Sequence, residues 1–263
     1  IAKPLGIVFS AFTTSSPAKV SPFQASLENN VPTCVTPIAK IIPKPVIPVT
    51  IHSPSTLAVL EASKIFENTF RLVNISLVNE FAQISDALGI SSREVLDAAA
   101  TKPYGFMKFN PSAGVGGHCI PVDPSYLAHV AEGLGVPATF IERANEVNLE
   151  MPNYIVTRVA VDNGATLAGK NVQVIGVAYK PNVADTRETP AELVIKELKR
   201  QGAKVSWHDP VVGTWQGESS TPLGGSDIAI VVTLHDAFEK KAVLASAPYV
   251  FDTTGKLTGA KGL

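Results

Sequence analysis

The sequence predicts an α/β protein in which an all-helical segment precedes a small doubly wound parallel sheet. Apolar residues recur at helical spacing between residues 55 and 163, and no stretch of that range reads as a strand. From Lys170 onward, short apolar runs alternate with a helix, which is the βαβ pattern of a parallel sheet. The length of 263 residues is typical of about two domains, and the apolar fraction of 45% is enough for a packed core.

The first 53 residues match neither pattern, because they are rich in proline. Nine of the 20 prolines precede residue 55. Proline lacks the N–H group that a strand ladder needs, so apolar runs such as residues 38–42 are edge strands or extended loop at most. Since the chain begins with Ile1 and not with methionine, we expect it to be a processed or trimmed product.

A long helix is predicted to begin at Pro54, with Ser53 as its N-cap and the proline at the first helical position. Gly89 is predicted to end this helix. Apolar side chains recur along the segment at helical spacing, at Phe66, Phe70, Val73, Leu77, Phe81, Ile84 and Leu88.

Three further helices are predicted in the same half of the chain. Residues 91–100 begin with the capping-box pattern S-S-R-E. After a loop of glycine, proline and aromatic residues over 101–121, the Asp-Pro pair at 123 and 124 predicts a third helix that ends near Gly133. The fourth helix, over about 138–163, is by its length the best candidate for a contact in a bundle or dimer.

The last third of the chain has the alternation of a parallel sheet. Thr189 and Pro190 predict the capped start of a helix that runs to Arg200 and ends at Gly202. Four strands are predicted, at residues 171–177, 203–207, 228–232 and 249–252. A doubly wound sheet binds its ligands at the carboxyl ends of such strands.

Charge and cysteine content exclude several classes of partner. With 22 basic and 23 acidic residues the net charge is −1, so neither nucleic acid nor an anionic membrane is expected as the main partner. There is no run of 18 apolar residues that could span a bilayer. The two cysteines, Cys34 and Cys119, cannot build a disulfide framework, and a reducing cytoplasm suits them.

The loop at residues 114–123 carries the strongest chemical signal. Gly114, Gly116 and Gly117 let the backbone approach a ligand closely, and Cys119 follows them with Asp123 four residues later. A glycine loop that runs into a helix start offers a thiol both access and a lowered pKa, which a nucleophile needs. The pattern also fits a buried structural cysteine beside a tight turn.

Two more groups of residues are candidates for the same site. Lys64 and Asn68 are four residues apart and share one helix face, where an ammonium and an amide together can stabilise an oxyanion. The segment 179–190 follows the first strand, and its Lys180 and Arg187 precede a helix N-terminus, a combination suited to phosphate binding. Taken singly, each also fits a solvated surface.

These stretches together resemble the UDP-glucose/GDP-mannose dehydrogenase family, in particular the branch that oxidises UDP-N-acetylmannosamine or UDP-N-acetylglucosamine. The matching motifs are E-N-T-F-R-x-V-N-I at residues 67–75, T-K-P-Y-G-F at 101–106, G-V-G-G-H-C-I-P-V-D-P at 114–124 and Y-K-P-N-V-A-D-T-R-E-T-P at 179–190. They keep the order and spacing of the family, and the resemblance covers about residues 45–260.

The resemblance implies three domains: a remnant of an NAD-binding domain at 1–53, a helical central dimerisation domain at 54–165, and a Rossmann-like UDP-binding domain at 166–263. It implies a cytoplasmic homodimer, associated through the central helices, that serves polysaccharide biosynthesis. The implied reaction is oxidation of the C6 alcohol of a UDP-sugar to the uronic acid, with two NAD.

The resemblance also implies roles for single residues. Cys119 would form a thiohemiacetal and then a thioester, and Asp123 would take part in proton transfer. Lys64 and Asn68 would stabilise the oxyanion, while Arg187 would reach the cofactor. The residues expected to contact the substrate are Gly114, Gly116, Gly117, Phe109 and Lys180.

The sequence departs from the family in three places. The G-x-G-x-x-G fingerprint of a dinucleotide site does not occur. If residues 16–22 match the family segment S-P-E-R-V-x-P-G, Ala18 replaces a glutamate that assists hydrolysis, and Lys19 replaces an arginine. The family's D-T-R-N becomes D-T-T-G at 252–255. The alternatives to a dehydrogenase are therefore a catalytically impaired nucleotide-sugar-binding homodimer and a truncated relic of the family.

Overall fold

The computed structural model describes residues 54–263. The predicted proline-rich remnant, including Ala18, Lys19 and the N-cap at Ser53, lies outside the described residues. The chain divides into two compact units, residues 1–67 and residues 68–263. Within 54–263, no helix has both the length and the apolar character needed to cross a membrane.

The predicted helix bounds are confirmed for three of the four helices before the sheet. Helix α3 (Pro54–Leu88) begins at the predicted proline and stops where Gly89 adopts a φ of +70°. Helix α4 (Ser92–Ala99) is capped by Ser91, whose hydroxyl accepts a hydrogen bond from the N–H of Glu94. Helix α6 (Thr139–Asp162) follows the prediction to within a residue at each end.

Helix α5 (Cys119–Gly133) corrects the prediction, because it begins four residues before the Asp-Pro pair. Pro121 is tolerated in the first turn, where its missing N–H has no intrahelical partner in any case. Pro124 therefore lies inside the helix and not at its start. The consequence is that Cys119 is the first residue of a helix and not part of the preceding loop.

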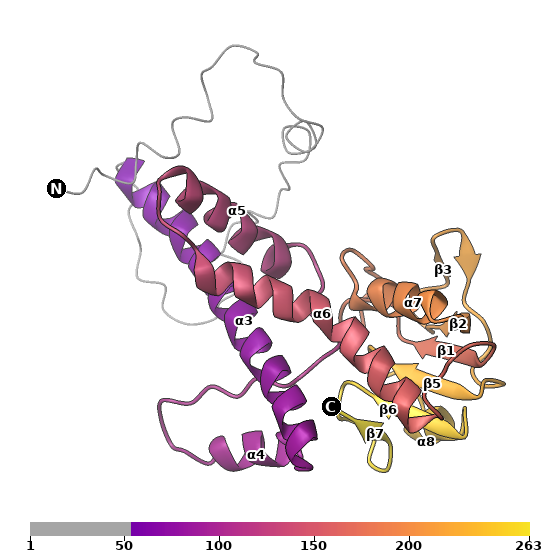
Figure 1. The fold of residues 1–263 in the computed structure, drawn as a ribbon. Coiled ribbons are helices and arrows are strands. Elements are labelled where there is room, and N and C mark those ends of the chain that lie inside the picture. The colour runs from indigo at the N-terminus through magenta and orange to yellow at the C-terminus, as the bar shows by residue number, and fades with distance from the viewer. Residues whose placement is uncertain (1–53) are drawn as a thin grey trace. The chain divides into compact units, whose positions relative to one another are not determined.

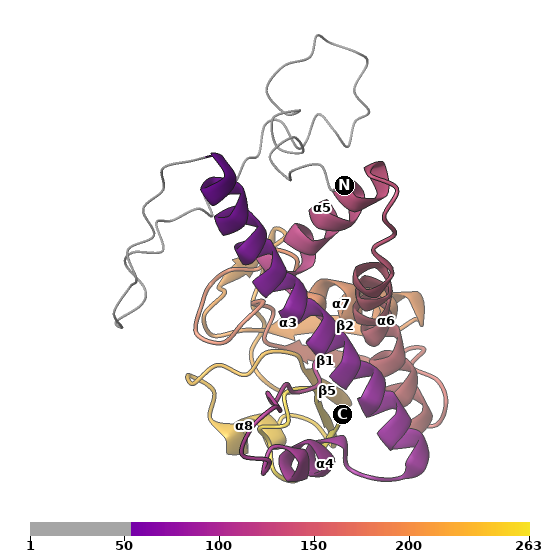
Figure 2. The same cartoon turned by 90° about the vertical axis from the view of Figure 1, so that its left-hand side faces the viewer.

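Helix α3 packs on α6 through polar and small side chains. Asn79 donates a hydrogen bond to Asn148 across the two helices at 2.9 Å, and Asn148 donates to Ser76 at 2.8 Å. All three side chains are buried. The apolar stripe that predicts the helix lies mostly elsewhere on it: Phe70, Leu77 and Leu88 are 40%, 61% and 66% exposed in the single chain. Figure 2 shows α3 with α4 beside its C-terminal end.

The C-terminal residues form a five-stranded parallel sheet in the order β2-β1-β5-β6-β7. The strands are β1 (Asn171–Ile175), β2 (Lys204–His208), β5 (Ile228–Val231), β6 (Tyr249–Asp252) and β7 (Lys261–Gly262). The four predicted strands are confirmed to within two residues at their ends. The short β7 was not predicted, and neither were helix α8 (Lys240–Leu244) and the hairpin of β3 (Thr214–Trp215) with β4 (Glu218–Ser219).

Helices cover both faces of this sheet, as a doubly wound fold requires (Figure 1). Alternate residues of a strand point to opposite faces. Val172 and Ile230 accordingly pack with α6 and with α7 (Pro190–Arg200), whereas Val231 packs with α8 on the other face. The carboxyl end of β1 leads into the segment that carries Lys180 and Arg187.

Candidate active site

The glycine loop packs directly against the segment that follows β1. A Cβ atom on Gly116 would lie 2.8 Å from Pro190 and 2.9 Å from Tyr179, and one on Gly117 would lie 2.8 Å from the ring of Tyr179. Gly117 also donates a backbone hydrogen bond to the carbonyl of Arg187 at 3.1 Å. Close loop packing is therefore a physical reason for glycine at these two positions.

Gly114 belongs to the same contact. It adopts a φ of +133°, and an added Cβ would lie 3.0 Å from the carbonyl oxygen of Asn148. Ser112, two residues earlier, donates its N–H to Asn79 and its hydroxyl proton to the carbonyl of Gly114. The polar contact between α3 and α6 thus continues through Ser112 to Gly114, and these hydrogen bonds hold the first residue of the glycine loop in place.

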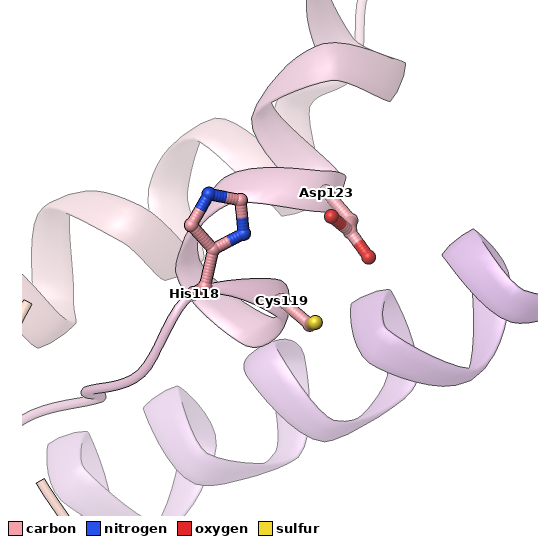
Figure 3. Close-up of side chains that lie close together, drawn as sticks. All are labelled: His118, Cys119 and Asp123. Atoms are coloured by element: carbon pink, nitrogen blue, oxygen red, sulfur yellow. The ribbon is translucent and has the colours of Figure 1, made fainter. Parts of the chain in front are cut away.

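Cys119, Asp123 and Asn68 are brought together across 55 residues of sequence. Cys119 and Asp123 lie one turn apart at the start of α5, and Figure 3 shows both side chains on the same side of that helix. The buried amide of Asn68 donates a hydrogen bond of 2.6 Å to the Asp123 carboxylate. At a helix N-terminus the dipole favours negative charge, so this position suits a thiolate.

The neighbours of Lys64 and Phe109 are a carboxylate and an aromatic ring, respectively. Lys64 lies in the unit of residues 1–67, where its ammonium pairs with Glu67 at 3.1 Å and both side chains are half exposed. The ring of Phe109 stands edge-to-face against Phe70, with the ring centroids 5.8 Å apart. Phe109 therefore has an aromatic neighbour on α3.

Lys180 and Arg187 lie on the surface of the segment after β1. The ammonium of Lys180 is exposed and lies 5.2 Å from the centre of the Tyr179 ring. Arg187 forms a two-pronged ion pair with Asp185, at 2.6 Å for the closest pair of atoms. The hydrogen bonds from Arg187 lower the pKa of Asp185. Asp185 is the main cause that raises the pKa of Arg187, and Tyr179 and Cys119 contribute less.

The buried pair of His235 and Asp209, which the sequence did not reveal, anchors the segment that follows β1. Asn182 donates its backbone N–H to Nδ1 of His235 at 2.8 Å, so the ring proton is on Nε2, which contacts Asp209 at 3.0 Å. Asp209 also accepts hydrogen bonds from four backbone N–H groups, those of Val177, Ala178, Val211 and Val212. The only sequence signal was that both residues follow a predicted strand closely.

The turn at residues 252–255 also has a partner that was not predicted. Arg93, from α4, donates hydrogen bonds to the carbonyls of Thr253 at 2.8 Å and Pro111 at 3.3 Å. Burial lowers the pKa of Arg93, and Asp252 and Asp97 act in the opposite direction. A guanidinium from another element thus lies at the turn where D-T-T-G replaces D-T-R-N.

His118 is a further site residue that was not predicted. Its ring lies beside Cys119 and Asp123, and the donor atoms of the three side chains are within 4.8 Å of one another (Figure 3). The sequence carried the signal, since His118 directly precedes the candidate nucleophile. The site thus brings together an imidazole, a thiol, a carboxylate and the amide of Asn68, which donates a hydrogen bond to that carboxylate.

Two models of one family match the chain. Residues 58–150 match the central domain of the UDP-glucose/GDP-mannose dehydrogenase family, and residues 173–258 match the UDP-binding domain of the same family. The first match contains Asn68, Cys119 and Asp123, and the second contains Lys180 and Arg187.

Individual relatives agree with the family models. A UDP-N-acetyl-D-mannosamine dehydrogenase of Methanococcus maripaludis is 39% identical over 183 residues, which are 68% of this chain and 42% of that protein. A UDP-N-acetyl-D-glucosamine 6-dehydrogenase of Salmonella typhi is 38% identical over 61% of this chain and 38% of its own length. The chain therefore spans about two fifths of the curated relatives that it matches.

A solved structure has the same arrangement of elements. The UDP-D-ManNAc dehydrogenase of Pyrococcus horikoshii superposes with a TM-score of 0.65 at 26% identity. The superposition covers 78% of this chain and 51% of the other.

Proposed function

This chain belongs to the UDP-glucose/GDP-mannose dehydrogenase family, and on that premise we propose that it is the catalytic and nucleotide-binding part of a UDP-N-acetylhexosamine 6-dehydrogenase. The proposed overall reaction oxidises the C6 alcohol of the sugar to the uronic acid, with two NAD. The observation that carries this proposal is the position of Cys119 at the N-terminus of α5, beside a carboxylate that Asn68 orients.

In the proposed chemistry, Cys119 is the nucleophile. Its thiolate attacks the carbon of the C6 aldehyde, and the carbon–sulfur bond forms as the carbonyl oxygen becomes an oxyanion. Asn68 and Lys64 are proposed to stabilise that oxyanion, and Asp123 to exchange protons with it or with water. After the second oxidation, attack by water breaks the carbon–sulfur bond of the thioester, which releases the carboxylate and restores the thiol.

We propose that the substrate lies beside the glycine loop and the segment that follows β1. Lys180, exposed after β1, suits a phosphate of the UDP group. Phe109 and the loop at 114–117 are proposed to contact the sugar. In this proposal the central domain comprises residues 54–165 and the UDP-binding domain comprises residues 166–263, as predicted from the sequence. The cytoplasmic location stays a prediction.

The described residues do not by themselves build a site for NAD. Among residues 54–263, no strand leads into a helix through the glycine spacing that a dinucleotide pyrophosphate requires. Arg187 is the one residue predicted to reach the cofactor, and Asp185 already holds its guanidinium.

A direct test is NADH formation by the purified chain with NAD and either UDP-N-acetylmannosamine or UDP-N-acetylglucosamine. Turnover that is lost in Cys119→Ser would show both that this chain binds NAD and that Cys119 is the nucleophile. Turnover no higher than that of the Cys119→Ser variant contradicts the proposal that this chain oxidises UDP-sugars on its own.

A second candidate function is a catalytically impaired nucleotide-sugar-binding protein, which the alanine at position 18 favours. A ligand that binds only the folded state stabilises it by about 2.7 kcal/mol at a concentration of 100 times Kd. Such a protein would show a higher melting temperature with UDP-sugar but no turnover. An unchanged melting curve at millimolar UDP-sugar would contradict both functions.

A further inference from the structure

We propose that His118, Cys119 and Asp123 form a binding site for a zinc-like divalent cation, and that the bound ion blocks the Cys119 thiol. The sulfur of Cys119, a ring nitrogen of His118 and a carboxylate oxygen of Asp123 are within 4.8 Å of one another. All three side chains are partly exposed, so an ion can reach them from solvent. Figure 3 shows Cys119 and Asp123 on α5, with His118 at the residue that directly precedes this helix.

The three donor types select the class of ion. Thiolate, imidazole and carboxylate are the usual ligands of Zn²⁺, which binds them at about 2.0–2.3 Å. Around a tetrahedral ion, ligand atoms at those lengths are roughly 3.5 Å from one another. Side-chain rotations that move each ligand atom by about 1 Å would therefore bring all three into contact with one ion. Mg²⁺ prefers oxygen ligands in an octahedral arrangement and would not be held here.

The surroundings support a three-ligand site with an open position. Asn68 donates its hydrogen bond to Oδ2 of Asp123, which orients the carboxylate and leaves its other oxygen for an ion. His118 makes no side-chain capping bond at the start of α5, so its ring can turn toward the thiol. The nearby positive charge of Arg187 is compensated by Asp185. Water would fill the fourth position, and the thiol proton would leave to solvent as the metal–sulfur bond forms.

The consequence for the site would be reversible blocking of the thiol. A sulfur bound to a metal ion cannot attack a carbonyl carbon or an alkylating reagent at its normal rate. Because the ion uses the same sulfur as the proposed thiohemiacetal, metal and substrate chemistry would exclude each other. His118 takes no part in the proposed oxidation, so its substitution separates the two roles.

The first experiment measures metal binding directly, in the full chain with Cys34→Ser so that Cys119 is the remaining thiol. Co²⁺ titration should give the near-ultraviolet sulfur-to-metal band and the intense visible bands of a tetrahedral thiolate site. Zn²⁺ should displace Co²⁺, whereas Mg²⁺ should not. A Co²⁺ spectrum that lacks the sulfur band would overturn the proposal.

The matched pair of variants is His118→Gln and His129→Gln. His129 lies on the same helix, is exposed and is outside the cluster. Loss of an outer partner of a metal site costs about 10–100-fold in affinity, so loss of a ligand should weaken Zn²⁺ binding at least about tenfold. We expect this for His118→Gln alone. Equal affinities in the two variants would exclude His118 as a ligand.

The second experiment follows alkylation of Cys119 by iodoacetamide in the same Cys34→Ser background. Zn²⁺ should slow alkylation in the parent and in His129→Gln but not in His118→Gln at the same Zn²⁺ concentration. Alkylation that Zn²⁺ leaves unchanged in the parent would show that the ion does not bind the sulfur. Both readouts are independent of dehydrogenase activity, so they stand or fall separately from the proposed function.

Discussion

The amide of Asn68 is the residue on which the geometry of the candidate site most depends. It is 3% exposed and forms a 2.6 Å hydrogen bond with a carboxylate from another helix. Hydrogen bonds to charged groups contribute about 1.5–3 kcal/mol, and an unpaired buried partner costs more than the bond contributed. A single buried side chain thus both stabilises the contact between α3 and α5 and aims Asp123 toward the thiol.

We predict that Asn68→Ala lowers the free energy of unfolding by about 1.5–3 kcal/mol, because Asp123 loses its donor. The control is Asn74→Ala on the same helix, whose amide bonds only the carbonyl one turn back. Urea denaturation of both variants measures the difference. If the two variants lose the same stability, the contact with Asp123 contributes nothing beyond a local helix bond.

Asp209 is the buried carboxylate on which acid stability should depend. Burial alone would raise its pKa, but hydrogen bonds from the backbone N–H groups of Val212 and Val211 and from His235 lower the pKa below the ordinary value. The stability that these bonds provide is therefore complete above an unfolded pKa of about 3.9 and is lost as pH falls through the native pKa.

We predict that Asp209→Asn is destabilised by about 1–3 kcal/mol at pH 7. The NH₂ group of the new asparagine would face backbone N–H groups, which are also donors and now bond to the carboxylate. The variant should also lose less stability than the parent when the pH is lowered from 6 to 3. The exposed Glu132→Gln serves as the control for loss of one carboxylate. Urea unfolding curves between pH 6 and pH 3 measure how the free energy of unfolding of each protein changes with pH. Equal acid dependence in Asp209→Asn and the parent would rule out Asp209 as its source.

At the scale of elements, the site is a contact between two loops and one helix start. The glycine loop that leads into α5 packs closely on Tyr179 and Pro190, and the segment after β1 is hydrogen-bonded in turn to His235. The start of α5 at Cys119 then sets the direction of the thiol. None of these elements would position the Cys119 thiol alone.

We predict that Gly116→Ala disturbs this contact. Its added Cβ would meet Pro190, Tyr179 and the carbonyl of Glu188 at 2.8–2.9 Å, although its φ is not in the left-handed region. Overpacking of this kind costs about 1–3 kcal/mol. Gly133→Ala, also outside that region and with open space around it, should be neutral or slightly stabilising. Melting temperatures compare the two, and a harmless Gly116→Ala would show that the loops are not tightly packed.

At the scale of the whole molecule, the exposed apolar side chains of α3 indicate a surface that binds another chain. Phe70, Leu77, Ile84 and Leu88 follow one stripe of the helix and are each at least 40% exposed, while the opposite side buries Ser76 and Asn79. A contiguous apolar stripe on a long helix is typical of an interface between chains. We therefore propose that the homodimer predicted from the sequence forms through α3. Helix α6, which its length made the candidate for a bundle or dimer contact, buries much of its apolar side within the single chain.

We predict that the double variant Leu77→Glu with Ile84→Glu is monomeric where the parent is dimeric, because each chain would bury two carboxylates against those of its partner. Val161→Glu, which changes an equally exposed apolar residue on α6, should leave the mass unchanged. Sedimentation equilibrium measures both. A parent that sediments as a monomer, or a double variant that still dimerises, would contradict this interface.

The sequence by itself determined the bounds of the longer helices other than the start of α5, and of the four longer strands, because their signals are local. Prolines at first helical positions, capping side chains at Ser91 and Thr189, and glycines after helix ends act within a few residues of the chain. The start of α5 was missed for the same reason: an Asp-Pro pair has the local form of a helix start, yet here it lies inside the first two turns.

The tertiary structure alone decided which side chains meet. The pairs of Asn68 with Asp123, Asp209 with His235 and Arg93 with Thr253 join residues 26–160 positions apart, and no local pattern marks them. It also decided that α3 buries its polar side against α6, since a pattern of apolar residues shows that a helix has two faces but not what covers each one. The sequence determined which residues could carry the chemistry, and packing determined which of them share a site.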